Sequence, residues 1–444
     1  MIPGNQAESR YDLAHSTLIE MMRRSLPNGP EVAKLAVATI GGHLINLRHK
    51  GMRAVKQGGK TVYLGDEGLG PIYGGRDGNN LRCHAMLLGE KGTGKDIWKY
   101  QFFFGEDALL KDIVPAVEVG GVTNAGIVGS KVPQRGGGFE WERGELWEER
   151  NSILFFGEFD VVTKAMKSRH SSEIVNSLLA GLDHGLVSVN QAGVKDKYVT
   201  NSTFFACNQP ERHEKMTGFD RRFTFHRNRP PTGDMAEWYK RHFAEHKRGE
   251  WRDDAILEGL RDAWRERVFA INDIESISLS KELSDHIVRS KHVPYDMQGI
   301  LTNAIMGHHA IAAPSLEGDV EVPCTDYYKI LVWDMTAGRK TAHADPRVYD
   351  LLKTNTEGKG QVVSTLQAER IALSRRRATE AMEDCVKANS PLWLRYVRAG
   401  HKDWVDTKCV VMPTGLTVKE LRGMGYQIHA VLDGDGQDVS EEEW

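Results

Sequence analysis

The sequence predicts an α/β protein with a parallel β-sheet core, followed by helical segments. Three observations lead to this fold class. Between residues 81 and 230, short apolar runs alternate with helix-like stretches and glycine turns, which is typical of successive βα units. A glycine-rich loop with a lysine, GEKGTGKD at 89–96, directly follows one of these runs. Residues 235–340 carry a mostly helical pattern.

Length and composition are those of a globular protein with more than one domain. At 444 residues the chain exceeds the size at which one core usually stops growing, and two or three domains are expected. Apolar residues make up 40% and charged residues 27%, which excludes a largely disordered chain. Because the net charge is only −3, any contact with nucleic acid must come from local basic patches.

The sequence also bears on compartment. The five cysteines are far apart and form no CxxC pair, which argues against a disulfide framework and a zinc site. No run of about 18 apolar residues is present, and the N-terminus lacks the layout of a signal peptide. We therefore expect a cytoplasmic protein without a membrane partner.

The segment before the sheet is expected to be a helical entry followed, over residues 51–80, by an insertion or hairpin without chemistry. Residues 11–50 are helical in pattern, and the turn signal PNGP at 27–30 divides them into two helices. Residues 51–80 are rich in glycine around one short strand-like run, TVYL at 61–64, and predict an insertion or hairpin.

The glycine loop predicts a phosphate-binding P-loop. Its glycines allow backbone N–H groups to surround phosphate oxygens, a lysine supplies a positive charge, and the next helix directs its N-terminus at the anion. A strand-like run before the loop and a helix-like run after it favour this interpretation over a plain glycine turn. The predicted nucleotide-binding residues are Gly89, Glu90, Lys91, Gly92, Thr93, Gly94, Lys95 and Asp96.

Three later segments supply candidate catalytic residues. The strand-like SILFF brings Glu158 to a strand end, where it can orient the attacking water; the alternative is a solvated acidic end. The run STFFAC brings Asn208 to a position between water and γ-phosphate, although an asparagine can also cap a turn. In GFDRRF, Arg221 and Arg222 are candidates for a positive charge delivered to a neighbouring subunit, unless both are plain surface arginines.

Together these segments resemble an AAA+ ATPase, and more narrowly the ATPase module of the minichromosome-maintenance (MCM) replicative helicases. The similarity is colinear over about residues 27–230. NGPEVAKLAVATIGG resembles the helix before the P-loop, and GGGFEWERGELWEERNSILFFGEFD covers the helix-2 insert and the Walker B strand. LLAGLDHGLVSVNQAGV matches the pre-sensor-1 hairpin, and CNQPERHEKMTGFDRRF the sensor-1 and arginine-finger region. The resemblance implies ATP and Mg²⁺ as ligands and a homo-oligomer, most simply a hexameric ring.

Both residues that contact magnesium in the family are changed. Asp96 stands where the P-loop has Ser, and Gly157 where the Walker B strand has Asp. We expect Asp96 to replace one metal contact, since a carboxylate suits Mg²⁺; the alternative is that the site has lost its metal. The family's finger arginine falls on Gly218, and its second sensing arginine falls near Met297.

Two segments are candidates for DNA contact. In the family's pre-sensor-1 hairpin a lysine tracks DNA; here Gln191 takes that position, with Lys195 and Lys197 close by. Near the C-terminus, residues 348–388 have helix-turn-helix spacing, and the next segment is typical of a wing. The domain resembles a winged helix; the alternative is a helical bundle with a solvated arginine cluster. The arginines predicted to contact DNA there are Arg375, Arg376 and Arg377.

The sequence as a whole predicts a DNA-translocating ATPase of DNA replication, with helicase activity. The main alternative is a nucleotide-binding initiator or scaffold that hydrolyses ATP poorly, and a second is an AAA+ remodeller of protein partners. The expected domains are a short N-terminal extension (1–26), the AAA+ core (27–232), a helical lid (233–342), a winged helix (343–413) and an acidic tail (414–444).

Overall fold

The computed structural model divides into two compact units, residues 1–332 and 333–444. All four predicted domain boundaries lie in, or at the edge of, segments outside the described residues. The structure describes residues 29–73, 80–89, 99–106, 108–119, 124–133, 135–160, 162, 172–191, 194–209, 213, 217–228, 254–290, 293–313, 315–325, 327–329, 331–332, 335–336, 363–364, 394–401, 410–413 and 426–432.

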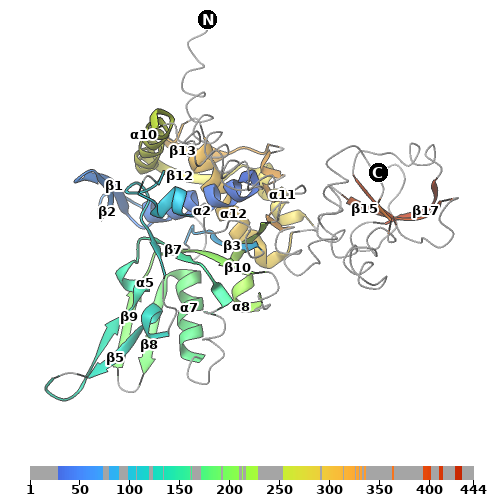
Figure 1. Ribbon diagram of the computed structural model, residues 1–444. Coiled ribbons are helices and arrows are strands. Elements are labelled where there is room, and N and C mark those ends of the chain that lie inside the picture. Colours follow the sequence, from blue (N-terminus) through green and yellow to red (C-terminus); the bar gives the residue numbers. More distant parts are fainter. Residues whose placement is uncertain are drawn as a thin grey trace, which may run out of the picture. The chain divides into compact units, whose positions relative to one another are not determined.

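The core of the first unit is a five-stranded sheet in which every neighbouring pair is parallel (Figure 1). Its spatial order is β11-β3-β10-β7-β4, and the predicted parallel α/β core is confirmed. Phe155 and Phe205 stack across two central strands with ring centroids 5.3 Å apart. The strands are β3 (His84–Gly89), β4 (Ala116–Glu118), β7 (Ile153–Phe156), β10 (Thr203–Asn208) and β11 (Phe223–Asn228).

Helices α2 (Gly29–His49) and α12 (Gln298–Ala312) lie side by side, and both contact the sheet (Figure 1). They approach most closely at Gly41 and Gly307, where a Cβ on either residue would overlap backbone atoms of the other helix. This contact joins the helix before the P-loop to the segment expected to form the lid. Helix α7 (Ser172–His184) precedes a turn at Gly185, whose φ of +74° favours glycine.

Two antiparallel hairpins project beside α7 (Figure 1). One consists of β5 (Gly129–Pro133) and β6 (Phe139–Arg143), and the other of β8 (Leu186–Gln191) and β9 (Val194–Val199). They occupy the segments that resemble the helix-2 insert and the pre-sensor-1 hairpin. The shorter helices around them are α4 (Asn124–Val128), α5 (Glu145–Glu148) and α8 (Thr217–Asp220).

The remaining elements of this unit include one predicted hairpin and one unpredicted strand pair. The hairpin expected in 51–80 is β1 (Met52–Gln57) with β2 (Lys60–Gly65). The region expected to be mostly helical also contains two parallel strands, β12 (Ile274–Leu279) and β13 (Gly318–Val322). The other elements are η2 (Tyr100–Phe104), α10 (Asp254–Ala270), η4 (Ile271–Asp273), α11 (Lys281–Arg289) and η5 (Tyr295–Met297). No described helix is long and apolar enough to cross a lipid bilayer.

The described part of the second unit is an antiparallel sheet in the order β14-β16-β15-β17. Strand β14 starts a segment that the sequence analysis assigns to helix, and β17 lies within the expected tail. The pairing of β17 with β15 is consistent with its alternating apolar residues, whose period of two is typical of a strand. The strands are β14 (Val363–Ser364), β15 (Leu394–His401), β16 (Val410–Pro413) and β17 (Tyr426–Leu432).

Candidate nucleotide site and arginine pocket

The carboxyl ends of three neighbouring strands bring together residues that the sequence assigned to nucleotide chemistry. Strand β10 lies between β3 and β7, and its last residue, Asn208, pairs with Leu88, one position before Gly89. On its other side Ala206 pairs with Phe156, two residues before Glu158. The start of the P-loop, Asn208 and Glu158 therefore share one edge of the sheet.

Asn208 has an unused donor at this edge. The residue is 2% exposed, and its Oδ1 accepts a hydrogen bond from the backbone N–H of Gln209 at 2.9 Å. Its Nδ2 is buried and finds no partner among the described residues. A buried amide that makes only part of its hydrogen bonds is costly, and it is satisfied by an acceptor brought by a ligand. A phosphate oxygen or an attacking water fits that requirement, while Glu158 is exposed at the same edge.

The ammonium of Lys99 lies beside Gly157, the position where the family has its Walker B aspartate. A Cβ on Gly157 would lie 3.8 Å from Nζ of Lys99. Lys99 is 5% exposed and forms an ion pair with Glu118, the last residue of β4. An aspartate at 157 would therefore have this ammonium as a neighbour of its side chain. Within the described residues no group of three or more His, Cys, Asp or Glu is arranged for a metal ion. Of the two positions that contact magnesium in the family, the Walker B position is Gly157, and the P-loop position, Asp96, lies outside the described residues.

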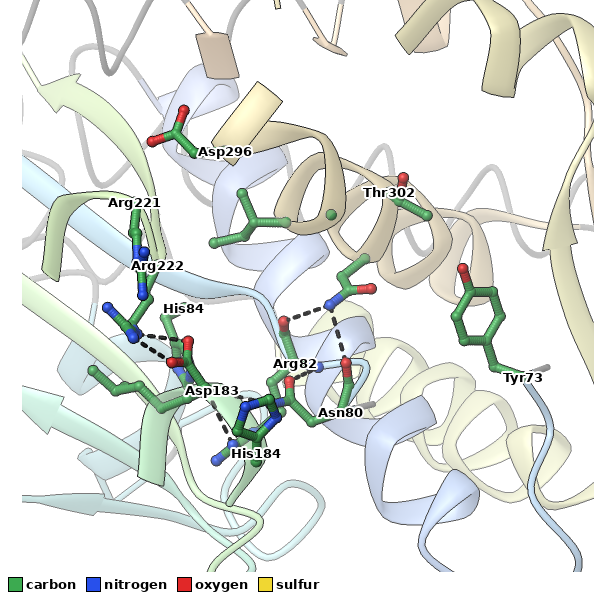
Figure 2. Close-up of a pocket in the computed structure, with 14 residues that line it drawn as sticks. Tyr73, Asn80, Arg82, His84, Asp183, His184, Arg221, Arg222, Asp296 and Thr302 are labelled. Carbon is green, nitrogen blue, oxygen red and sulfur yellow. Dashed lines mark hydrogen bonds and ion pairs between the residues drawn. The ribbon is translucent and has the colours of Figure 1, made fainter. Parts of the chain in front are cut away.

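At the opposite edge, the amino ends of β3 and β11 border a pocket of about 270 Å³ (Figure 2). The lining of this arginine pocket includes Arg221 and Arg222, and the C-terminal end of α7 contributes Asp183 and His184. From the other side, Asp296 and residues of α12 complete it. The position near which the resemblance expects a sensing arginine, Met297, is buried and directly follows Asp296 in the chain.

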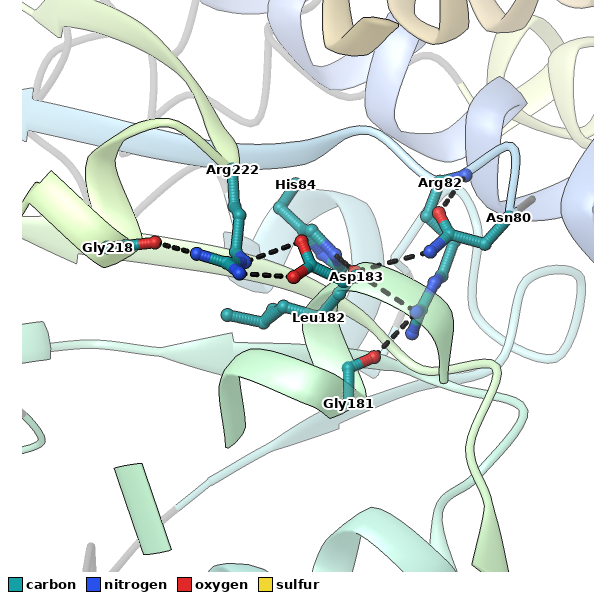
Figure 3. A network of polar contacts seen from close by, with 8 residues as sticks. All are labelled: Asn80, Arg82, His84, Gly181, Leu182, Asp183, Gly218 and Arg222. Carbon is teal, nitrogen blue, oxygen red and sulfur yellow. Dashed lines mark hydrogen bonds and ion pairs between the residues drawn. The ribbon is translucent and has the colours of Figure 1, made fainter. Parts of the chain in front are cut away.

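The two neighbouring arginines of the pocket have different environments, and Figure 3 shows the contacts of Arg222. Arg222 is 8% exposed; its Nε donates to Asp183 at 2.6 Å, and its Nη atoms donate to the same carboxylate and to the carbonyl of Gly218. Arg221, in contrast, is exposed. Arg222 is thus held by contacts within the chain, whereas Arg221 is exposed.

Two other residues that line the pocket, Arg82 and His84, are buried and hydrogen-bonded. Arg82 donates to the carbonyls of Ser202 and Gly181 at 2.7 and 2.6 Å. Burial lowers the pKa of the Arg82 guanidinium, and the carboxylate of Asp183 acts in the opposite direction. His84 Nε2 donates to the carbonyl of Leu182, and its Nδ1 accepts from a backbone N–H; desolvation and the nearby guanidinium lower its pKa. Such a neutral imidazole holds α7 against the start of β3.

The arginine pocket and the predicted P-loop lie at opposite ends of β3. Strand β11 pairs in register with β3, with Phe223 opposite His84 and Asn228 opposite Gly89. The five residue steps between the pocket end and the P-loop end of β3 span about 16 Å at about 3.3 Å per residue. An arginine side chain of six bonds of about 1.5 Å cannot exceed about 9 Å. Arg221 therefore cannot reach phosphates held at the predicted P-loop of its own chain.

The projecting hairpins carry the predicted DNA contacts. Lys195 and Lys197 are exposed on β9, while the backbone of Gln191 ends β8. Between them, Asp196 accepts hydrogen bonds from Arg143 of the other hairpin at 2.7 and 2.9 Å, and this guanidinium lowers the pKa of the carboxyl. The two hairpins are thus joined by a bidentate ion pair.

Some predicted site residues lie outside the described residues. These are the P-loop residues after Gly89, including the metal candidate Asp96, and the arginines of the helix-turn-helix segment; their roles stay predictions. Lys99 and Asp183 are site residues that sequence reasoning missed. Nothing in the local sequence of either residue signals its partner, because each contact joins separate elements.

No protein-family model matches the sequence, and no curated protein is significantly similar to it.

Proposed function

We propose that this protein is an AAA+ ATPase of the MCM-like kind that couples ATP hydrolysis to movement along DNA in replication. The observation that carries the proposal is the order of the central strands. It brings Gly89, Asn208 and Glu158 to one edge of the sheet, where Nδ2 of Asn208 has no hydrogen-bond partner among the described residues. ATP bound there has an amide to contact the γ-phosphate and a carboxylate to orient water.

The arginine pocket supports a composite site between subunits. An exposed arginine that cannot reach its own P-loop is suited to neutralise the phosphates of a neighbouring subunit. We assign this finger role to Arg221, since Arg222 is occupied by Asp183 and Gly218. Assembly into a closed ring, most simply a hexamer, follows if every subunit donates one finger and receives one.

Mixed assemblies test this assignment. Arg221→Ala should lower turnover by about 10³-fold or more with nucleotide binding retained, which is the usual size of a finger effect. Arg222→Ala should instead lower the free energy of unfolding, because it leaves the Asp183 carboxylate without its bidentate partner. Mixing Arg221→Ala protein with Lys95→Ala protein should restore activity at hybrid interfaces. Co-assembled mixtures no more active than either parent would refute a finger acting between subunits.

A second candidate function is a nucleotide-binding replication initiator or scaffold that hydrolyses ATP poorly. The observation that favours it is the lysine ammonium beside Gly157. ATPase assays with single- and double-stranded DNA separate the two functions. Turnover stimulated by DNA supports the motor, whereas stable ATP binding without turnover supports the scaffold.

A further inference from the structure

The geometry points to Lys99 as a built-in cation that takes the place of Mg²⁺ in nucleotide binding. The inference rests on the nucleotide site that both candidate functions share. It concerns a residue outside the recognised motifs: Lys99 lies beyond the P-loop sequence, and the strand that carries its partner Glu118 belongs to none of those motifs.

The first step of the argument is position. Glu118 ends β4, and β4 pairs with β7 in parallel, so that Glu118 lies opposite Phe155. Gly157 follows two residues after Phe155, directly beyond the end of β7, at the carboxyl edge that holds Glu158. Because Gly157 has no side chain, the space that an aspartate would fill is open to Lys99, whose Nζ lies 3.8 Å from the missing Cβ.

The second step is how firmly the ammonium is held. Its side chain is 6% exposed, and Glu118 accepts a hydrogen bond from it. The hydroxyl of Tyr100 donates to the other oxygen of Glu118 at 3.2 Å, and Nζ also lies 5.1 Å from the centroid of the Tyr100 ring. A buried ammonium is expensive unless it is paired, and this one is fixed at the edge before any nucleotide arrives.

The third step is charge. A nucleotide at this edge brings its phosphates beside the open position at Gly157, where an ammonium can donate charge-assisted hydrogen bonds to phosphate oxygens. A divalent cation in the same shell would be repelled by the fixed charge of Lys99. Nucleotide affinity should therefore depend on Lys99 and hardly on Mg²⁺.

Equilibrium binding of ATP with a fluorescent ribose label tests this inference on the full-length protein. With wild-type protein, affinity in EDTA should lie within about threefold of the affinity in Mg²⁺. Lys99→Met should weaken binding in EDTA by about tenfold or more, the size expected for losing a hydrogen bond to a charged group. Lys99→Arg should retain most of the affinity.

Two further variants control for folding and for the partner left behind. Glu118→Gln keeps the lysine charge and should bind at least as tightly as wild type. Lys99→Met combined with Glu118→Gln should lose affinity like Lys99→Met alone, since the loss arises from the missing cation and not from an unpaired carboxylate. Circular dichroism confirms that each variant is folded.

A double variant should make nucleotide binding depend on Mg²⁺ instead of on Lys99. Lys99→Met combined with Gly157→Asp removes the ammonium and introduces a carboxylate at the metal side. This protein should bind the labelled ATP about tenfold more tightly when Mg²⁺ is added.

The outcomes separate the inference from the proposed function. Wild-type binding that requires Mg²⁺, as expected if Asp96 holds the metal, overturns the role of Lys99 and leaves the ATPase proposal standing. Equal affinity of Lys99→Met and wild type in EDTA also overturns it. Absence of nucleotide binding in both buffers overturns the proposed function itself, and the inference with it.

Discussion

Acid should destabilise this protein through His43, a buried histidine of α2. The imidazole is fully buried; Nε2 donates to the carbonyl of Asn151 and Nδ1 accepts from the hydroxyl of Thr203, both at 3.1 Å. These contacts tie α2 to the loop before β7 and to the start of β10. Desolvation lowers the pKa of His43 from 6.5 to about 3, although its hydrogen bond to Asn151 acts in the opposite direction.

The sign and size of the effect follow from proton linkage. The unfolded chain binds a proton near pH 6.5 and the folded chain only near pH 3, so the stability contributed by neutral His43 is complete above pH 6.5. It is lost as the pH falls toward the folded pKa. Between pH 8 and pH 5 the loss from this one group is about 2 kcal/mol, and the full shift corresponds to about 5 kcal/mol.

Urea unfolding at pH 8 and pH 5 measures this loss. In His43→Gln the difference in unfolding free energy between the two pH values should be smaller than in wild type by about 2 kcal/mol. His184→Gln, which removes an exposed imidazole, is the matched control and should keep the wild-type difference. If His43→Gln and wild type lose the same free energy on acidification, the reasoning about a buried neutral imidazole is refuted.

Two further predictions concern DNA contact and the helix pair. Replacing Lys195 and Lys197 by glutamine should weaken DNA binding. The slope of log affinity against log salt concentration should fall by nearly one unit for each phosphate that is no longer neutralised. An unchanged slope would contradict a DNA contact by this hairpin. Gly307→Ala should lower the free energy of unfolding by about 1–3 kcal/mol or more, because its Cβ would overlap the backbone of α2. Gly299→Ala on the same helix has open space, and it should be neutral or stabilising in urea unfolding; equal effects of both alanines would contradict the close approach of the two helices.

The strands of the sheet were largely predictable because four of them, β3, β7, β10 and β11, contain short apolar runs. Parallel strands covered on both faces bury every side chain, and β3, β7 and β10 are buried at every position. Strand β4 was missed, since three residues are too few to show a period. The pairing of β12 with β13 was missed as well, because α11 and α12 separate these two strands in the sequence.

The candidate site was predictable only as a set of residue types. Glycine and lysine in the P-loop, an acidic strand end and a polar strand end are local patterns, and each has a chemical reason that a sequence displays. That Asn208 and Glu158 share an edge with Gly89 depends on strand order, because β10 lies between β3 and β7 although it follows both in the chain.

The sequence alone thus predicted the apolar strands of the central sheet and the positions of charged and glycine-rich segments, since those properties are set by local residue types. Only the tertiary structure decided which of the charged side chains are paired within the chain and which are exposed. Arg221 and Arg222 are identical in type, yet only Arg222 lies where the end of α7 brings Asp183 within 2.6 Å. Likewise, Lys99 lies beside Gly157 because two segments that are distant in the sequence meet at one edge of the sheet. The sequence does not show which residue occupies the space left by the glycine.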